Sequence, residues 1–584
     1  MIGPYQMVAI NLICSLIVLG GALFYKFIFP KKKINLFALL LVISVLPIIS
    51  IARAGVYESG DFDLHIRRAM EFYNLLSQGN VIPTWAGDLN ATYGYPLFAF
   101  NYILPYYIIS LFHFLGFSFV ASLKNFLALN IFLSGVFMYL FSKNYFKNTL
   151  TAFTVSIFYL FAPYHLIDVH FRITIGEILA YTLIPLIFYF LHKFINGKKI
   201  VYILLAGLML GLVILSHIAV AVYLIPAIIL YVYITAKQFT KTALYSFAII
   251  FISLLVAFFQ WSASLIYYPY LFVSTHPSSN LPYFPTIADL LYSPWRLGFL
   301  FQGPKGELSF LLGYAQVLTV ILLIILLLRR RAGSAKKIIA LWLTLFLIYI
   351  FFVLPYSSFI WKYLPLIKDS GSQRILIPVA FCTSLLAGYF TKAIKRKWII
   401  YALILLAIGS TILNWGNRRV IPTINDAILR SDLSLSYQWG DEHFYALPKW
   451  VNPKQQWFTK IPAKHIEITQ GKAQVIEISR TSTLHTYKIN ALTPVKLNEN
   501  TLYFPGWTAT LNGKPILLKP DKNGIITLNL SEGKGVLKIA YQDLFLFQLT
   551  KIISIISLIL ITLYSLIYFL SKRFKLGSKV LSKD

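Results

Sequence analysis

Acidic residues are scarce in this sequence: only 21 of its 584 residues are aspartate or glutamate, and charged residues of both signs make up 12%. Hydrophobic residues reach 58%. A composition so poor in charge and so rich in apolar side chains excludes an ordinary soluble globular protein. Cysteine is rarer still, because only Cys14 and Cys382 occur, both inside apolar runs. The sequence therefore indicates neither a disulfide framework nor a cysteine-based metal cluster.

Long apolar runs are what the chain has instead. They match the length of about 20 residues that a helix needs to cross a hydrocarbon core about 30 Å thick. The first run lacks the basic leader and small-residue cleavage site of a signal peptide, so we interpret it as a retained span. We expect a polytopic α-helical membrane protein of about thirteen spans. These are 7–29, 34–52, 125–142, 148–162, 176–195, 200–216, 218–236, 243–262, 309–328, 338–355, 375–391, 398–414 and 547–570.

The net charge of +31 would suit a nucleic-acid partner, but its distribution argues against one. Lysine and arginine gather in short clusters between apolar runs, for example at 31–33 and 395–397. Such clusters are typical of cytoplasmic loops under the positive-inside rule. We therefore predict a multi-pass protein of the cell membrane whose partner is the lipid bilayer. Its N-terminus lies outside, and the short basic tail after residue 571 is cytoplasmic.

The apolar stretch 99–117 conflicts with this charge rule if it crosses the membrane. All later basic clusters would then lie outside. If the stretch only dips into the outer leaflet or lies along it, every cluster falls in the cytoplasm. Its Pro105, His113 and three tyrosines suit an interfacial helix pair. We choose this second topology.

From about 415 to 546 the composition becomes that of a soluble domain. Alternating runs such as 473–479 predict β-strands, and Asn512-Gly513 is a hairpin turn signal. We expect a small extracytoplasmic β-rich domain, a sandwich, at 415–546. The other parts are a membrane domain at 1–414, with a first external loop at 53–124, and a final span with a basic tail at 547–584.

The segment 60–68, with the sequence GDFDLHIRR, gathers charge directly after an early span. If it is helical, spacings of three and four residues place its charged side chains on two adjacent faces. One face carries Asp61, His65 and Arg68, and the next carries Asp63 and Arg67.

Carboxylates at the edge of a membrane bundle mark functional sites. Asp61 and Asp63 can activate an acceptor hydroxyl as a general base, or bind a divalent metal such as Mg²⁺ or Mn²⁺. The alternative is that they only cap the helix. His65, Arg67 and Arg68 can bind phosphate, or can serve as interfacial anchors and local partners of the aspartates.

Further candidates occur at the outer ends of later spans. Arg172 and Glu177 can pair across one turn, and Arg172 can bind phosphate. Arg374 opens the span near 375 as a phosphate or sugar contact. His217 lies between two spans, where a histidine is more often a packed residue of the bundle.

Several short motifs occur together over most of the chain. They are 60–68, Trp85, Tyr93-Gly-Tyr-Pro-Leu-Phe98, Ala162-Pro-Tyr-His165, the stretch from Arg172 to Glu177, and 503–507 followed by 511–514. In combination they resemble a bacterial membrane-protein family labelled 6-pyruvoyl-tetrahydropterin synthase-related, which is akin to the YfhO-like proteins. The sequence shows no grouped-histidine zinc site of the soluble pterin synthases.

That family in turn resembles the GT-C superfamily of polytopic glycosyltransferases, which use polyprenyl-phosphate-linked sugars. The resemblance implies that Asp61 or Asp63 matches the acidic motif of their first external loop. It also implies that 99–117 corresponds to the outer-leaflet helices of that loop. Asp168 and Glu177 are candidates for a second acidic position. An extra span before the acidic loop departs from the simplest pattern.

The sequence thus predicts a glycosyltransferase that moves a sugar from a polyprenyl-phosphate donor to a glycan, lipid or protein acceptor of the cell envelope. The alternative is a non-catalytic transporter, flippase or assembly factor for lipid-linked envelope polysaccharide. The acidic groups at the outer ends of the spans favour the enzyme, since transporters more often carry ionisable groups deep in their spans. The catalytic candidates are Asp61 and Asp63. The substrate-binding candidates are His65, Arg67, Arg68, Tyr95, His165, Arg172, Glu177 and Arg374.

Overall fold

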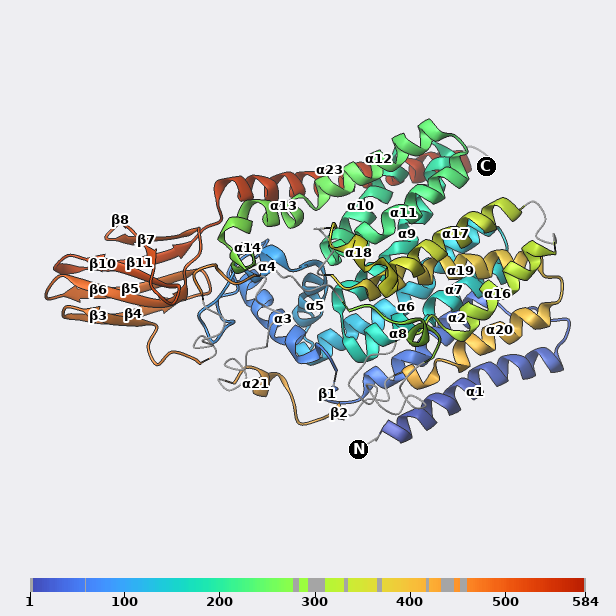
Figure 1. Ribbon diagram of the computed structural model, residues 1–584, viewed down its shortest axis with the longest axis horizontal. Coiled ribbons are helices and arrows are strands. Elements are labelled where there is room, and N and C mark those ends of the chain that lie inside the picture. The colour runs from blue at the N-terminus through green and yellow to red at the C-terminus, as the bar shows by residue number, and fades with distance from the viewer. Residues whose placement is uncertain are drawn as a thin grey trace.

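A helical bundle and a β-sandwich lie at opposite ends of the molecule, with short helices between them (Figure 1). The structure is a computed structural model that describes residues 4–57, 59–276, 283–292, 310–329, 335–364, 370–415, 420–431, 446–451 and 460–581. The segments 416–419, 432–445 and 452–459 of the expected β-domain lie outside the described residues.

Eight helices of the described residues are long and apolar enough to cross a membrane. A ninth span results if α7 (Thr149–Leu160) is counted together with α8 (Pro163–Ile167) and the π-helical turn η2 (Asp168–Arg172), from which it is bent by 47°. The eight are α1 (Pro4–Ile28), α6 (Phe119–Phe146), α9 (Ile175–Gly197), α11 (Ile218–Ala236), α12 (Phe239–Val256), α17 (Lys336–Val353), α19 (Leu376–Ala393) and α23 (Phe545–Leu581).

Four of the thirteen expected spans are shorter apolar helices. The expectation is therefore confirmed only for the eight or nine long ones. A local cause is visible at the expected span 309–328, where Gly313 has a φ of 101° and the helix begins only after it. The short helices are α2 with the turn η1 (Leu36–Ala52), α10 (Ile200–Ser216), α16 (Tyr314–Leu328) and α20 (Lys397–Gly409).

The stretch 99–117 holds only the 11-residue helix α5 (Leu104–Phe114), which follows the single turn α4 (Leu97–Phe100). At 1.5 Å per residue α5 is about 16 Å long, which is too short for a core of about 30 Å. This length agrees with the expectation that the stretch does not cross the membrane.

The long helix α6 begins and ends as its sequence dictates. The side chain of Ser118 accepts a hydrogen bond from the backbone N–H of Ala121 at 3.1 Å, which satisfies one of the free donors of the first turn. Lys147 ends the helix in a left-handed conformation, with a φ of 56°. The helix is therefore longer at both ends than the span 125–142 expected from hydropathy.

Exposed apolar side chains cover the outer helices of the bundle. Leu16 and Ile17 of α1 and Leu560 of α23 are each more than 60% exposed. A soluble protein rarely exposes so continuous an apolar surface. Because α1 and α23 lie at the edges of the bundle (Figure 1), these faces suit contact with lipid.

The C-terminal region is a sandwich of two antiparallel sheets, as the alternating runs predicted. One sheet has the order β3-β6-β10-β9 and the other the order β4-β5-β11-β7-β8. Side chains of both sheets, among them Leu497 and Ile539, belong to one buried apolar core. The strands are β3 (Ile466–Gln470), β4 (Ala473–Arg480), β5 (Leu484–Ala491), β6 (Val495–Leu502), β7 (Trp507–Leu511), β8 (Lys514–Ile516), β9 (Lys519–Pro520), β10 (Ile525–Leu530) and β11 (Gly533–Tyr541).

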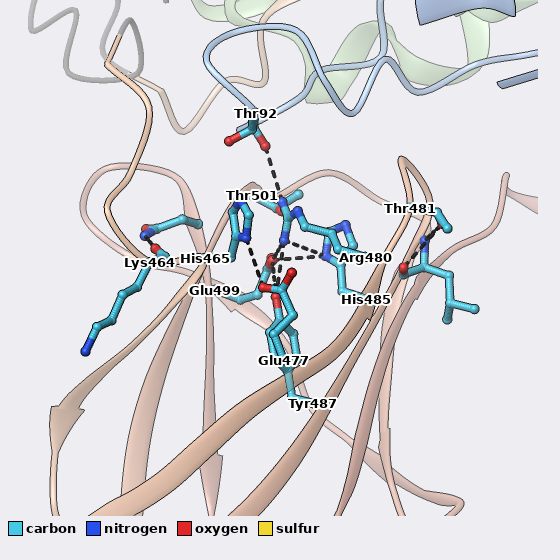
Figure 2. A network of polar contacts seen from close by, with 12 residues as sticks. Thr92, Lys464, His465, Glu477, Arg480, Thr481, His485, Tyr487, Glu499 and Thr501 are labelled. Atoms are coloured by element: carbon cyan, nitrogen blue, oxygen red, sulfur yellow. Dashed lines mark hydrogen bonds and ion pairs between the residues drawn. The ribbon is translucent and has the colours of Figure 1, made fainter. Parts of the chain in front are cut away.

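The loop 80–95 fastens the sandwich to the bundle. Trp85 is buried and packs edge to face on Trp507 with ring centroids 5.3 Å apart. The backbone N–H of Leu502 donates to the carbonyl of Tyr93 at 2.9 Å. The loop and the sandwich approach each other so closely at Gly87 that a Cβ atom there would lie 2.6 Å from the backbone of Ser482. A polar network around Arg480 adds a further link to this loop (Figure 2).

The connections that carry the lysine clusters lie far from the sandwich. In Figure 1 the turn between α1 and α2 and the turn between α19 and α20 are both at the opposite end of the bundle, and so is the C-terminal end of α23. These turns contain 31–33 and 395–397. The basic clusters and the sandwich therefore lie at opposite ends of the bundle.

Candidate functional site

The acidic motif lies at the start of the amphipathic helix α3 (Phe62–Ser77), between the bundle and the sandwich (Figure 1). The backbone N–H of Gly60 donates to the carbonyl of Phe171 at 2.8 Å, and that of Asp61 donates to the carbonyl of Arg172 at 3.0 Å. A Cβ atom at Gly60 would lie only 3.0 Å from the Arg172 carbonyl oxygen. The structure thus brings the acidic motif into direct contact with the segment around Arg172.

The two aspartates occupy the first turn of α3 in different ways. Asp61 is at the N-cap position but its side chain does not make the capping bond, because Ser59 Oγ accepts instead from the N–H of Phe62 at 3.3 Å. Capping therefore does not account for Asp61. Asp63 is 32% exposed and pairs with Arg67 at 3.6 Å, as their spacing predicted.

A metal at the two aspartates remains a prediction. Among the described residues, no three His, Cys, Asp or Glu side chains gather in a way that could hold an ion. Mg²⁺ is often held by one or two carboxylates with water completing its shell, so Asp61 and Asp63 fit such an ion only as partial ligands.

A buried ion-pair network lies directly behind Asp61. Arg172 donates to Asp168 at 2.5 Å and to Glu177 at 3.1 Å, which confirms the predicted pair of Arg172 and Glu177. Its guanidinium also donates to the hydroxyl of Tyr164 at 2.7 Å. Arg374 donates to Glu177 at 2.9 Å from a helix nearly 200 positions later. The charges of two arginines and two carboxylates thus balance, and the guanidinium of Arg172 already has hydrogen-bond partners without a bound phosphate.

Aromatic residues line the space between α3 and this network. Nδ1 of His65 lies 2.9 Å from the Tyr106 hydroxyl, and its Nε2 lies 3.4 Å from that of Tyr102. The ring of Tyr102 in turn lies near His217, with centroids 6.0 Å apart. These tyrosines, expected only to anchor an interfacial helix, are therefore part of the site, a role that no sequence signal distinguished.

Three other predicted site residues are buried in supporting positions. His165 stacks on Tyr181 with ring centroids 4.1 Å apart, and its Nδ1 lies 3.1 Å from the carbonyl of Leu160. Tyr95 pairs through its backbone with Ala86 in the loop 80–95. Arg68 is 5% exposed. The structure brings the starts of α3 and α9, the turn η2 and Arg374 together. Tyr95 instead belongs to the loop 80–95, which contacts the sandwich.

The face of α3 that carries Asp63 and Arg67 also carries Glu71, an acidic residue that the sequence did not single out. Glu71 is 3% exposed, and its Oε1 accepts from the backbone N–H of Asp88 at 3.3 Å. Burial and the neighbouring carboxylate of Asp88 raise the pKa of Glu71 well above its ordinary value. A protonated or strongly perturbed carboxyl group beside a cavity is a feature of binding sites.

Fold and site together define a multi-pass membrane protein with a polar site at one end of its bundle. Residues 100–421, more than half of the chain, match the membrane-protein family described as 6-pyruvoyl-tetrahydropterin synthase related domain. The chain belongs to this family, as its motifs predicted. The matched region includes Arg172, Glu177 and Arg374. It begins at residue 100, so Asp61 and Asp63 lie outside it.

Two further proteins are similar to the chain. An uncharacterized protein of Lactococcus lactis subsp. cremoris (strain MG1363) is 25% identical over 207 residues, which cover 35% of this chain and 34% of that protein. The match thus spans about a third of that relative. The single-particle cryo-EM structure of the arabinofuranosyltransferase AftD from Mycobacteria is similar with a TM-score of 0.38 and 13% identity, over 66% of this chain and 28% of that one. A TM-score this low does not establish a common fold, so an activity has to be argued from the site.

Proposed function

We propose that the chain is a membrane glycosyltransferase that moves a sugar from a polyprenyl-phosphate-linked donor to a cell-envelope acceptor at the outer face of the cytoplasmic membrane. The observation that carries this proposal is the position of Asp61. It begins a polar helix at the end of an apolar bundle, its side chain does not cap that helix, and its backbone is bonded to Arg172. A carboxylate at this position can act as the general base for an acceptor hydroxyl that approaches from the aqueous side.

In the proposed reaction Asp61 accepts the proton of an acceptor hydroxyl. The hydroxyl oxygen then forms a bond to the anomeric carbon of the donor, and the bond from that carbon to the phosphate oxygen breaks. The electron pair leaves with the polyprenyl phosphate. Arg67 is the cation that we assign to this developing charge, because positioned donors stabilise it in the transition state.

The ion-pair network takes a positioning role in this scheme. Arg172 is 9% exposed and is already bonded to Asp168, Glu177 and Tyr164. Giving up these bonds for a phosphate would take Arg172 from the buried Asp168 and leave Glu177 with Arg374 alone, which is costly. We therefore assign Arg172, Glu177 and Arg374 to holding the start of α3 in place.

The charge distribution supports placing the site at the outer face. The basic clusters lie at the end of the bundle opposite the sandwich and the site (Figure 1). Under the positive-inside rule that end is cytoplasmic, which leaves α3 and the sandwich outside. A site at the outer surface of the bundle also favours a catalyst over a transporter, whose ionisable residues usually lie near the midplane.

The test uses the purified full chain with radiolabelled polyprenyl-phosphate hexoses and pentoses, and membranes of a deletion strain as acceptor. We expect transfer of label by the wild type, at least a hundredfold loss in Asp61→Asn, and no loss in Glu532→Gln, which alters an exposed carboxylate of the sandwich. The loss estimate of about a hundredfold is that of a removed general base. Full transfer by Asp61→Asn contradicts the role of Asp61. Movement of the labelled lipid across liposomes without product contradicts the enzyme and favours the transporter.

A further inference from the structure

A cavity of about 450 Å³ lies beside the site, on the face of α3 that carries Arg67 and Glu71. Its volume is within the range of small-molecule sites, about 300–1,000 Å³. Arg67 connects it to the acidic motif, because the same guanidinium pairs with Asp63. The lining of the cavity includes Arg67, Glu71, Asn74, Asp88, Phe119 and Arg430.

One wall of the cavity comes from a distant part of the chain. The short helix α21 (Asp426–Leu429) docks on the start of α6, where the carboxylate of Asp426 accepts from the N–H groups of Phe119 at 2.7 Å and Val120 at 3.2 Å. A carboxylate is favoured at a helix N-terminus, so this contact is a stable one. Arg430 follows directly and lies over the ring of Phe119, 5.4 Å from its centroid.

The same segment is fixed at its other end. Strand β2 (Val420–Ile421) pairs with β1 (Val56–Tyr57), just before the acidic motif. The stretch 420–431 is therefore held by two contacts, one with β1 just before α3 and one with the start of α6. This places a second guanidinium, Arg430, at the cavity that Arg67 already lines.

The floor of the cavity is a set of ordered hydrogen-bonding groups. Asn74 Nδ2 donates to Asp88 Oδ2 at 2.9 Å, and the backbone N–H of Asp88 donates to Glu71 at 3.3 Å. Tyr73 and Phe119 supply apolar ring surface next to these groups. Carboxylate, amide and guanidinium groups beside an aromatic surface can satisfy a ring that has hydroxyl groups at its edge and C–H groups on its faces.

We propose that this cavity binds a neutral pyranose unit of the acceptor glycan, with Asp88, Asn74 and Arg430 bonding its hydroxyl groups. The identification of the bound sugar as part of the acceptor rests on the proposed function, whereas the binding of a sugar in the cavity does not. A phosphate or an acidic sugar fits less well, because Asp88 would repel it and Arg67 is already paired with Asp63. The link through Arg67 and Asp63 then places the next hydroxyl of the bound glycan on the side of the cavity that faces the acidic motif.

The experiment measures sugar binding without turnover. The purified full chain in detergent is titrated with methyl glucopyranoside, methyl N-acetylglucosaminide and methyl rhamnopyranoside, and in parallel with methyl phosphate, by saturation-transfer NMR. We expect a pyranoside to bind and its Kd to rise about tenfold in Asp88→Asn and in Arg430→Ala, since each loses a hydrogen bond to a charged group. Arg396→Ala, which removes an exposed arginine at the other end of the bundle, is the matched control and should bind like the wild type.

The outcomes separate this inference from the proposed function. If the wild type binds a pyranoside but transfers no sugar from any donor, the sugar site stands and the enzyme is rejected. The inference itself fails if none of the pyranosides binds, if methyl phosphate binds and they do not, or if both cavity variants bind as well as the wild type. Arg430 is exposed, so its removal should not disturb folding, and an unchanged elution volume in size-exclusion chromatography checks this.

Discussion

The guanidinium of Arg480 in the sandwich donates a hydrogen bond to the backbone carbonyl of Thr92 at 3.2 Å, across the junction with the helical bundle (Figure 2). Thr92 is the last of three successive non-glycine residues with positive φ, after Asn90 at 52° and Ala91 at 51°. Such conformations cost free energy and persist only where the surrounding structure holds them. The sandwich therefore fixes the loop that carries Asp88.

The first prediction concerns this link. Arg480 also forms an ion pair with Glu499, whose side chain is fully buried. Removing one member of a buried pair costs up to about 3–5 kcal/mol. Without Arg480 the buried Glu499 would keep His485 and the hydroxyl of Tyr487 as polar partners. We expect Arg480→Ala to lower the thermal unfolding midpoint of the full chain clearly, as followed by tryptophan fluorescence. Lys538→Ala removes an exposed cation of the same sandwich and should leave the midpoint within error. Equal midpoints for the two variants would show that the pair contributes nothing.

The second prediction is the acid sensitivity of the sandwich. Burial alone would raise the pKa of Glu499, but His485 at 2.9 Å and Arg480 hold it below its ordinary value. Burial lowers the pKa of His485. Both groups bind protons less readily when folded, so their stabilising effect is complete above the unfolded pKa values, about 6.5 for histidine and 4.3 for glutamate, and is lost as the pH falls. The unfolding midpoint should therefore fall from pH 7 to pH 3, and the fall should be smaller in Glu499→Gln. A wild-type midpoint that does not change with pH would contradict this.

Glu71 should show the opposite sign. Its pKa is raised by burial and by Asp88, so the folded chain binds a proton more readily than the unfolded one. Its favourable contribution is complete below the unfolded pKa of about 4.3 and is lost as the pH rises through the folded value. We expect Glu71→Gln, which imitates the protonated form, to gain stability relative to the wild type at pH 8 and to lose this advantage at pH 4. The difference between the two unfolding midpoints at each pH measures the effect, and an advantage that grows on acidification would refute it.

Local pairs of the site were predictable from sequence spacing, and distant ones were not. Asp63 with Arg67 and Arg172 with Glu177 lie within one helical turn or one tight connection, so their contacts follow from local geometry. Arg374 lies in the turn before α19 and pairs with Glu177 at the start of α9. The two helices meet where Phe381 stacks on Phe188, a contact that no local pattern encodes.

The cavity, too, depends on contacts between distant positions that local sequence patterns do not predict. Glu71 looks like an ordinary polar residue of an amphipathic helix, and Arg430 like a loop residue after the last span of the bundle. They meet because β1 pairs with β2 and Asp426 caps α6, two contacts that join positions more than 300 residues apart. Hydropathy likewise found most helices but could not foresee where Gly313 delays one.

The last prediction tests the contact between the acidic motif and the ion-pair network. A Cβ atom at Gly60 would lie 3.0 Å from the Arg172 carbonyl oxygen, so in Gly60→Ala the start of α3 has to move by a few tenths of an ångström. Because a small misplacement of a catalytic group can cost a large part of the rate, we expect transfer to fall about tenfold. Gly197→Ala is the matched control, since nothing lies within 4 Å of its Cβ position. Both variants should unfold at the same temperature as the wild type. If Gly60→Ala transfers sugar at the wild-type rate, the close approach of Asp61 to Arg172 is not needed for the reaction, and the positioning role of the network is wrong.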